Sequence, residues 1–120
     1  MKPYQDARVK GEKLAKQYAE LEKADQVDFF NGSEAYYSVL GHNKKQEAIA
    51  VLIEKNDHKI YVYQLDKGIS QDKAATISRE KGASDIDKIT FGRYQDKPIW
   101  EVKSGNQYYL VDFETGAVIQ

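Results

Sequence analysis

The hydrophobic pattern of the sequence changes period in the same order twice, from a helical repeat to short runs typical of β-strands. In residues 3–24, apolar side chains recur at alternating spacings of three and four, which predicts an amphipathic helix. A second helix is predicted at about 71–81, with Ser70 as its N-cap and Gly82 as its C-terminal stop. A repeat of this order favours an α+β fold in which a helix packs on an antiparallel sheet.

The first helix is expected to bury one stripe of side chains against a sheet. Gly11 lies within this stripe and costs about 1 kcal/mol relative to alanine in a helix. Either the close approach of another element or plain tolerance explains its use. The residues of the stripe are Tyr4, Ala7, Gly11, Leu14, Tyr18 and Leu21.

Short aromatic and β-branched runs, separated by turn residues, follow each helix. These runs are typical of antiparallel strands. After the first helix they cover 27–30, 35–40, 49–54 and 59–65, and after the second they cover 88–94, 99–103 and 108–113. Turns are predicted at Asn31-Gly32-Ser33, Gly41-His42-Asn43-Lys44-Lys45, Asn56-Asp57, Ser104-Gly105-Asn106 and Glu114-Thr115-Gly116.

The two halves also resemble each other in sequence. Segment 60–68 aligns with segment 108–116 at a shift of 48 residues, with matching apolar, acidic and glycine positions. A structural duplication explains this match, but so does the general similarity of two hairpins that end in a polar turn and a glycine.

Charge and composition exclude several classes of protein. The chain has 18 Lys and Arg against 19 Asp and Glu, a net charge of -1, which argues against a dedicated nucleic-acid binder. It has no cysteine, which excludes disulfides, thiol catalysis and cysteine-based zinc sites. No apolar run is long enough for a transmembrane helix, and the first residues lack the apolar stretch of a secretion signal. A membrane anchor outside these residues stays open.

Ionisable side chains that could carry chemistry are scattered. His42 and His58 fall in predicted turns, lack the spacing of a metal motif, and are expected to be exposed to solvent. Asp85 and Asp87 would share one face if they lay on a strand, but they follow a predicted helix stop, where a solvated connection is expected.

Motifs of known catalytic and binding sites are missing. The sequence has no nucleophile elbow, P-loop, dinucleotide fingerprint or calcium loop. Asp25 and Asp28 are expected to be solvated acids, like the pair above. We therefore predict no catalytic residue, no cofactor and no metal site. A small enzyme or ligand-binding protein would require a deep pocket in which His42 or His58 meets a buried acid.

Aromatic residues are the densest functional feature, with nine Tyr, four Phe and one Trp. Adjacent tyrosines on a strand point to opposite faces, so one ring of each adjacent pair is expected to face away from the helix. Such a ring could anchor a protein partner, stack on a sugar or a nucleobase, or simply stabilise the sheet across strands. The lack of a basic groove weakens the nucleobase alternative. No partner-binding residue is singled out. The strand tyrosines are Tyr36, Tyr37, Tyr61, Tyr63, Tyr108 and Tyr109.

The first helix carries a modest excess of positive charge. Residues 1–24 contain six Lys or Arg and four Asp or Glu, and 6 − 4 gives a net charge of +2. Such a segment could lie near an anionic membrane surface, where each cation contributes about 1 kcal/mol. The alternative is an ordinary solvated helix face.

The order of residues in both halves resembles one protein family. The second half resembles a PepSY-type unit, and the first half resembles the domain found upstream of it in the YpmB, or TseB-like, proteins of Gram-positive bacteria. The resemblance covers about residues 24–119. In the second half it is carried by Ile69-Ser70, Lys73-Ala74-Ala75, Gly82, Ile99-Trp100-Glu101-Val102 and the segment from Tyr109 to Gly116. In the first half it is carried by Val27, Phe30, Gly32, Tyr36-Tyr37, Val39 and Gly41.

This resemblance implies a fold and a role. It implies two tandem cystatin-like or PepSY-like units, here residues 1–68 and 69–120, each with one helix on an antiparallel sheet of three or four strands. It also implies a non-enzymatic, extracytoplasmic protein, held by one N-terminal membrane anchor, that regulates cell wall elongation by contacting a penicillin-binding transpeptidase. Because PepSY units also restrain secreted peptidases, an inhibitor or regulator of a secreted protease is the alternative. No family motif marks binding residues.

Overall fold

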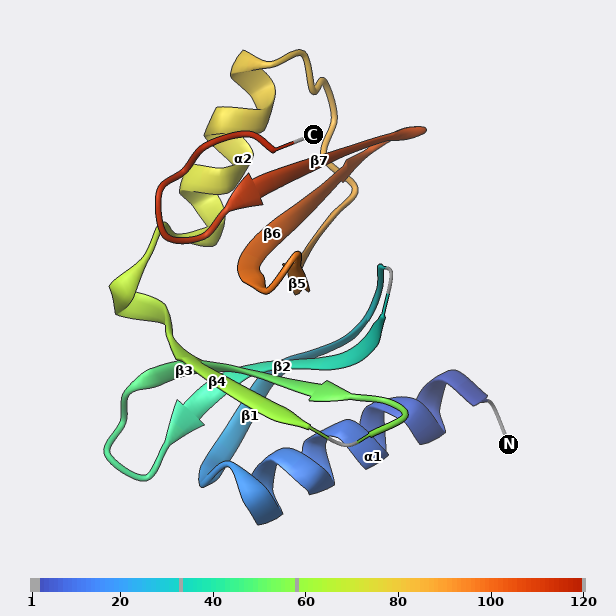
Figure 1. Cartoon of the computed structure of the whole chain (residues 1–120), viewed down its shortest axis with the longest axis vertical. Coiled ribbons are helices and arrows are strands. Elements are labelled where there is room, and N and C mark those ends of the chain that lie inside the picture. Colours follow the sequence, from blue (N-terminus) through green and yellow to red (C-terminus); the bar gives the residue numbers. More distant parts are fainter. Residues whose placement is uncertain (1–2, 33, 58, 120) are drawn as a thin grey trace. The chain divides into compact units, whose positions relative to one another are not determined.

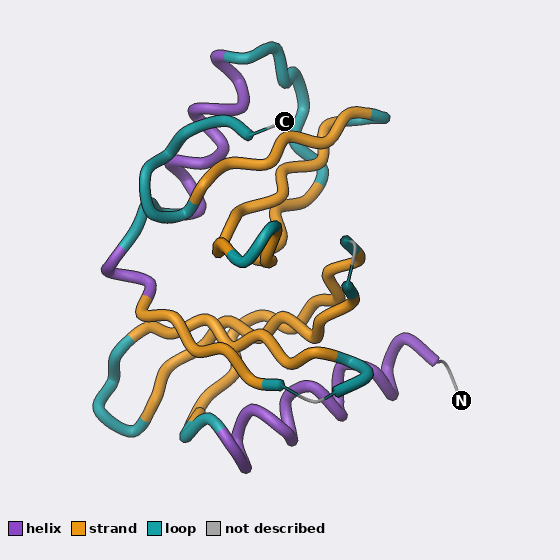
Figure 2. The backbone as a smooth tube through the Cα atoms, in the orientation of Figure 1, coloured by secondary structure: helices purple, strands orange, loops and turns teal. Residues whose placement is uncertain are grey.

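Figure 1 shows the computed structural model of the chain, which describes residues 3–32, 34–57 and 59–119. The chain divides into two compact units, Met1–Gln64 and Leu65–Gln120. Each unit combines a helix with strands, as the colours of Figure 2 show, and the strands of each sheet pair in antiparallel fashion. The predicted α+β class is therefore confirmed. The assignment of residues 1–68 and 69–120 as tandem cystatin-like domains stays a prediction.

The first unit consists of one helix and a four-stranded sheet. The helix α1 (Pro3–Tyr18) precedes the strands β1 (Leu21–Asn31), β2 (Ala35–Asn43), β3 (Ala48–Glu54) and β4 (Ile60–Gln64). The strands are antiparallel and lie in the order β1-β2-β3-β4. α1 packs against β1, β2 and β3.

The core of the first unit lies between α1 and one face of this sheet. Alternate residues of each strand contribute to it, because successive side chains on a strand point to opposite faces. Gly11 lets the helix approach closely, since a Cβ there would lie 3.1 Å from the Cβ of Tyr37. The buried members are Ala15, Ala19, Leu21, Val27, Tyr37, Val39, Ile49, Val51 and Ile53.

The first helix ends earlier than the sequence predicts. α1 stops at Tyr18, which is 61% exposed rather than buried, and Glu20 reverses the chain with a φ of 58°. Leu21 is buried, but as the first residue of β1 rather than as the last residue of the helical stripe. The spacing of Leu21 suits a helix, yet its pairing with Asn43 across the sheet decides the conformation.

The second unit consists of a three-stranded sheet and a shorter helix. A 3-10 turn, η1 (Leu65–Lys67), leads into α2 (Gln71–Glu80), which is followed by β5 (Lys88–Tyr94), β6 (Lys97–Ser104) and β7 (Gln107–Asp112). The strands are antiparallel in the order β5-β6-β7. α2 packs against β6 and β7.

Local sequence signals set both ends of α2 as predicted. The Ser70 hydroxyl accepts a hydrogen bond from the Lys73 N–H at 3.1 Å, which caps the first turn. Gly82 follows the helix with a φ of 114°, a conformation that favours glycine. Between these ends, Ala74, Ala75 and Ser78 form the buried face.

An aromatic cluster holds the core of the second unit. The ring of Trp100 lies edge-on to that of Phe91, with centroids 4.9 Å apart, and Phe113 completes the cluster. The Trp100 indole N–H donates to the carbonyl of Ile69 at 3.0 Å. Because Ile69 directly precedes Ser70, this bond ties the start of α2 to the sheet.

The last turn is held by one carboxylate. Asp112 accepts hydrogen bonds from the N–H groups of Glu114 and Thr115 at 2.8 and 3.1 Å. The predicted turn at 114–116 is thereby confirmed, and residues 117–119 return alongside β7 through a bridge between Val111 and Val118. Segments 60–68 and 108–116 are each the last strand of a unit with its following turn. Their origin by duplication stays a prediction.

We expect that a different sequence in the tight turn between β5 and β6 would make the chain more stable. Gln95 and Asp96 have φ values of 50° and 66°, so both central residues adopt the left-handed conformation of a type I′ turn, which favours Asn-Gly. The double substitution Gln95→Asn and Asp96→Gly should raise the free energy of unfolding by about 1 kcal/mol. Urea unfolding followed by Trp100 fluorescence measures this change, and an unchanged or lower midpoint would contradict the turn assignment.

Candidate interaction surfaces

The side chains of His42 and Asp25 are in close contact, which the sequence did not predict. His42 lies within β2, not in a turn, and its Nδ1 is 2.9 Å from Asp25 Oδ2. The register of β1 shifts between Ala24 and Gln26, and this irregularity lies at Asp25. Lys23 adds a second contact, 4.0 Å from the other Asp25 oxygen. His58 lies outside the described residues.

This pair has no further ligand around it within residues 3–32, 34–57 and 59–119. No group of three or more His, Cys, Asp or Glu side chains there is arranged to hold a metal ion. Both side chains of the pair are 42% exposed, so the low-dielectric surroundings that activate a catalytic dyad are missing. The geometry therefore fits a surface contact between two neighbouring strands.

The remaining acidic candidates serve local structure. Asp85 and Asp87 precede β5, so they do not share a strand face, and both are exposed as expected. The Asp87 carboxylate accepts from the Gly105 N–H at 2.9 Å, and the Asp85 carbonyl accepts from the Ser104 hydroxyl at 2.7 Å. Asp28 was expected to be solvated, but it is half-buried and accepts a hydrogen bond from the Gln26 side chain.

The tyrosines divide between the two faces of the first sheet, as their alternation predicts. Tyr37 belongs to the core beneath α1, whereas Tyr36 lies on the opposite face, with its ring 6.3 Å from those of Phe30 and Tyr61. Tyr36 and Tyr37 are both buried, so this pair stabilises the sheet. Tyr108 is 54% exposed on β7 and remains available to a partner.

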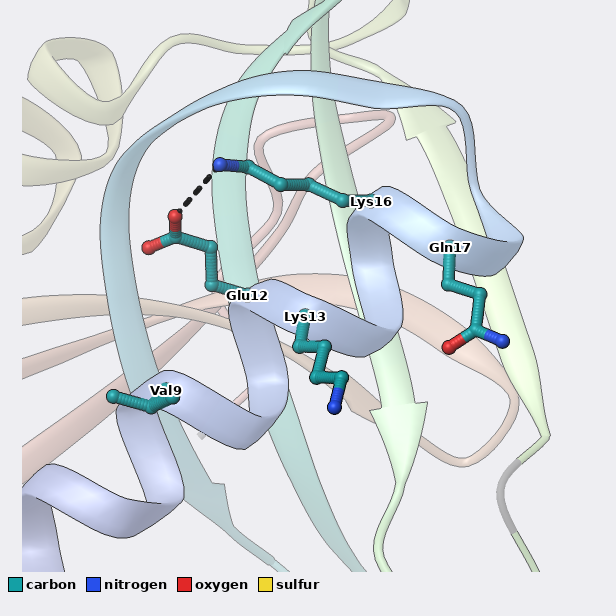
Figure 3. A pocket seen from close by; sticks show the side chains of 5 residues that line it. All are labelled: Val9, Glu12, Lys13, Lys16 and Gln17. Carbon is teal, nitrogen blue, oxygen red and sulfur yellow. Dashed lines mark ion pairs between the residues drawn. The ribbon is translucent and has the colours of Figure 1, made fainter.

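The outer face of α1 carries a shallow hollow of about 510 Å³ (Figure 3). Lys16 Nζ and Glu12 Oε2 form an ion pair of 2.9 Å along one side of it, and Val9 is 67% exposed. An exposed pair at this spacing contributes about 0.3–0.5 kcal/mol. The side chains that line the hollow come from successive turns of a single helix: Val9, Glu12, Lys13, Lys16 and Gln17. Such a surface fits a protein or lipid contact better than an enclosed small molecule.

Two glutamates have a perturbed protonation equilibrium. Burial raises the pKa of Glu54 above 4.5, and the negative charges of Glu34 and Asp57 raise it further. Burial also raises the pKa of Glu101, while the charge of Lys88 offsets part of this rise. Glu101 lies in the middle of β6, opposite Thr90 and Leu110 in the register.

We expect Glu101→Gln to change how stability depends on pH. A carboxyl with a raised pKa binds its proton more tightly in the folded chain, so stability falls as the pH rises from 4.5 through the raised pKa. The glutamine variant should lack this part of the decline and be more stable at neutral pH. Urea midpoints measured across this range test it, with the exposed Glu114→Gln as the control. Parallel profiles for Glu101→Gln and the wild type would contradict the expectation.

The comparisons with known proteins agree on one family. Residues 10–54 match the family model described as the cell wall elongation regulator TseB-like domain. The chain is 38% identical over 114 residues to the probable cell wall elongation regulator TseB of Bacillus subtilis (strain 168), covering 88% of this chain and 70% of that protein. The solved structure of the YpmB protein from Bacillus subtilis superposes with a TM-score of 0.78 at 32% identity, covering 100% of this chain and 96% of that one.

The first of these matches spans the end of α1 and the strands β1 to β3, and the other two extend over both units. The YpmB or TseB-like resemblance read from the sequence is thereby confirmed, while the PepSY description of the second half stays a prediction. None of the helices in the described part of the chain has the length and apolar character of a membrane span. This chain belongs to the TseB-like family of cell wall elongation regulators of Gram-positive bacteria.

Proposed function

We propose that this chain is a non-enzymatic, membrane-tethered protein outside the cytoplasm that regulates cell wall elongation by contacting a penicillin-binding transpeptidase. One observation carries the proposal: the 38% identity to a probable cell wall elongation regulator extends over 114 residues and therefore over both units. A regulator acts through other proteins, and exposed rather than enclosed surfaces are what the candidate sites of this chain offer.

The distribution of ionisable groups supports a role without catalysis. The pair His42 and Asp25 lies on β1 and β2, whereas Asp85 and Asp87 close a turn in the other unit. General acid–base chemistry requires such groups to converge on one cleft with pKa values held apart. The side chains of His42, Asp25 and Asp87 instead make local contacts, and Asp85 contributes its backbone carbonyl.

A binding assay tests the contact with the transpeptidase. The chain is immobilised and purified transpeptidase ectodomains are passed over it. We expect saturable binding to at least one of them. Inhibition of a secreted metalloprotease by the same chain, without any transpeptidase binding, would replace the proposal with the protease alternative.

A complementation assay tests the tether. In a Gram-positive strain that lacks its TseB-like gene, the chain is expressed once behind an N-terminal membrane-spanning helix and once as a freely secreted protein. We expect only the tethered form to restore normal cell elongation, because tethering raises the local concentration near a membrane-bound synthase. Equal rescue by the secreted form would remove the tether from the proposal.

A further inference from the structure

The edges of the two sheets are not protected equally. Exposed strand edges attract further strands, and proteins usually block them with charges, bulges, prolines or a covering segment. The outer edge of β7 is covered by residues 117–119, and β1 carries two irregularities of register. β5 carries Lys88 and Arg93. The charged residues of β1 are Glu22, Lys23, Asp25 and Asp28.

Within the described residues of the first unit, β4 has none of these devices. It is the last strand in the order of its sheet, and among the described residues only β3 pairs with it. Its sequence, Ile-Tyr-Val-Tyr-Gln, contains no charge and no proline. Its register with β3 runs without a shift from Ile60 to Gln64. β4 is therefore a regular, uncharged edge strand.

The alternation of hydrogen-bonded and non-hydrogen-bonded residue pairs in the β3–β4 hairpin shows which backbone groups of β4 point away from β3. The Glu54 N–H donates to the Lys59 carbonyl at 2.8 Å, so these two residues form a hydrogen-bonded pair of the antiparallel ladder. Hydrogen-bonded and non-hydrogen-bonded pairs alternate along such a ladder. Tyr61 and Tyr63 therefore bond toward β3. The N–H and C=O groups of the alternate residues, Ile60, Val62 and Gln64, point to the open side.

The side chains of β4 add an apolar surface beside this edge. Val62 is opposite Val51 of the core, yet it is 49% exposed, while Ile60 packs against the same core. On the other face, the Tyr61 ring lies edge-on to Tyr36, with centroids 6.3 Å apart. A strand added here would gain apolar contact with Val62 as well as backbone hydrogen bonds.

We propose that β4 binds an extended segment of a partner protein, which adds to the first sheet as a fifth strand. In strand addition the main chain supplies affinity and alternate side chains supply specificity. The uncharged edge selects a segment without charge at its centre, with an apolar residue beside Val62. Lys59, which directly precedes β4, favours an acidic residue opposite it. This inference deepens the proposed function, because it names the surface through which the partner is bound.

Proline at position 62 tests the edge directly. Val62→Pro removes one outward N–H and leaves the bonds between β3 and β4 in place, and proline is tolerated on edge strands in this orientation. Val62→Ile is the matched control, since it keeps the N–H, the β-branched shape and the apolar surface. Random peptides displayed on phage are selected on the immobilised wild-type chain, and the enriched peptides are then synthesised. We expect the enriched peptides to have alternating apolar sequences. They should bind the proline variant at least about tenfold more weakly than the wild type and bind the isoleucine variant almost as well as the wild type.

Amide hydrogen exchange of the wild-type chain gives a second readout that does not depend on the variant folding. In the free chain, the amides of Ile60, Val62 and Gln64 should exchange faster than those of Tyr61 and Tyr63. A selected peptide should then slow exchange at these three positions. Enrichment of no peptide, or of peptides that neither protect these amides nor distinguish the proline variant, would overturn the inference.

The same variants separate this inference from the proposed function. If transpeptidase ectodomains bind the wild type and Val62→Pro equally well, and no peptide protects β4, the edge is not the docking surface although the function stands. If peptides bind the edge as described but no transpeptidase binds, the edge inference holds and the named partner is wrong.

Discussion

Gly41→Ala should destabilise the first unit by about 3 kcal/mol, which is at the upper end of what overpacking usually costs. A Cβ at Gly41 would collide with the backbone carbonyl oxygen of Lys23 and lie 2.9 Å from Leu21 Cδ1. The collision cannot be relieved by a change of rotamer, because its main partner is backbone. Gly41 is opposite Ala24, between the two places where the register of β1 shifts, so the strands must separate or the irregular pairing must be lost.

The effect of Gly41→Ala should be measured by a method that reports the unfolding of the first unit separately from that of the second. Trp100 is the single tryptophan and lies in the second unit, so its fluorescence does not report directly on the first. The unfolding of the first unit is instead measured by urea unfolding followed by circular dichroism, together with amide hydrogen exchange in β1 and β2. Gly11→Ala serves as the control, because the helix propensity gained, about 1 kcal/mol, offsets its tight contact with Tyr37. Wild-type exchange rates in the Gly41→Ala variant would refute the close approach of β1 and β2.

Trp100→Ala should cost the second unit about 3–5 kcal/mol, the range found for truncation of a buried large aromatic residue. Trp100 is 2% exposed and packs edge-on against Phe91 and Phe113, so truncation leaves a large cavity. It also leaves the Ile69 carbonyl without its indole donor, at a point directly before the N-cap of α2.

A graded pair of variants separates packing from hydrogen bonding. Trp100→Phe keeps most of the aromatic contact and loses the hydrogen bond to Ile69, which should cost about 1–3 kcal/mol. Thermal unfolding followed by circular dichroism measures both variants. Equal midpoints for Trp100→Ala and the wild type would mean that the cluster with Phe91 and Phe113 does not hold this unit together.

Predictions from local signals succeeded where the physical cause is itself local. The limits of α2 follow from Ser70, which caps an N–H three residues later, and from Gly82, which adopts a positive φ. The strand predicted at 88–94 has those bounds in the structure. The turn at Ser104-Gly105-Asn106 is confirmed as well. Each of these features depends on residues within a few positions of one another.

The contacts and burial of the residues at the candidate surfaces were predicted less well from the sequence. The alternation of tyrosines predicted that Tyr36 and Tyr37 would face opposite ways, but not that both would be buried. The contact between His42 and Asp25 joins residues of different strands at a place where the pairing is irregular. A pattern of alternate residues cannot show such an irregularity, because the extra residue of a bulge changes which side chains meet.

The sequence by itself determined the class of the fold, the two ends of α2, the turns at 104–106 and 114–116, and the membership of a family of cell wall regulators. These follow from periodicity, from contacts between near neighbours in the chain, and from the order of residues. Only the tertiary structure decided that α1 ends at Tyr18, that Leu21 begins a strand, and that β4 presents a regular edge. These features depend on which strands pair and in which register, and that is set by the free energy of contacts between residues far apart in sequence.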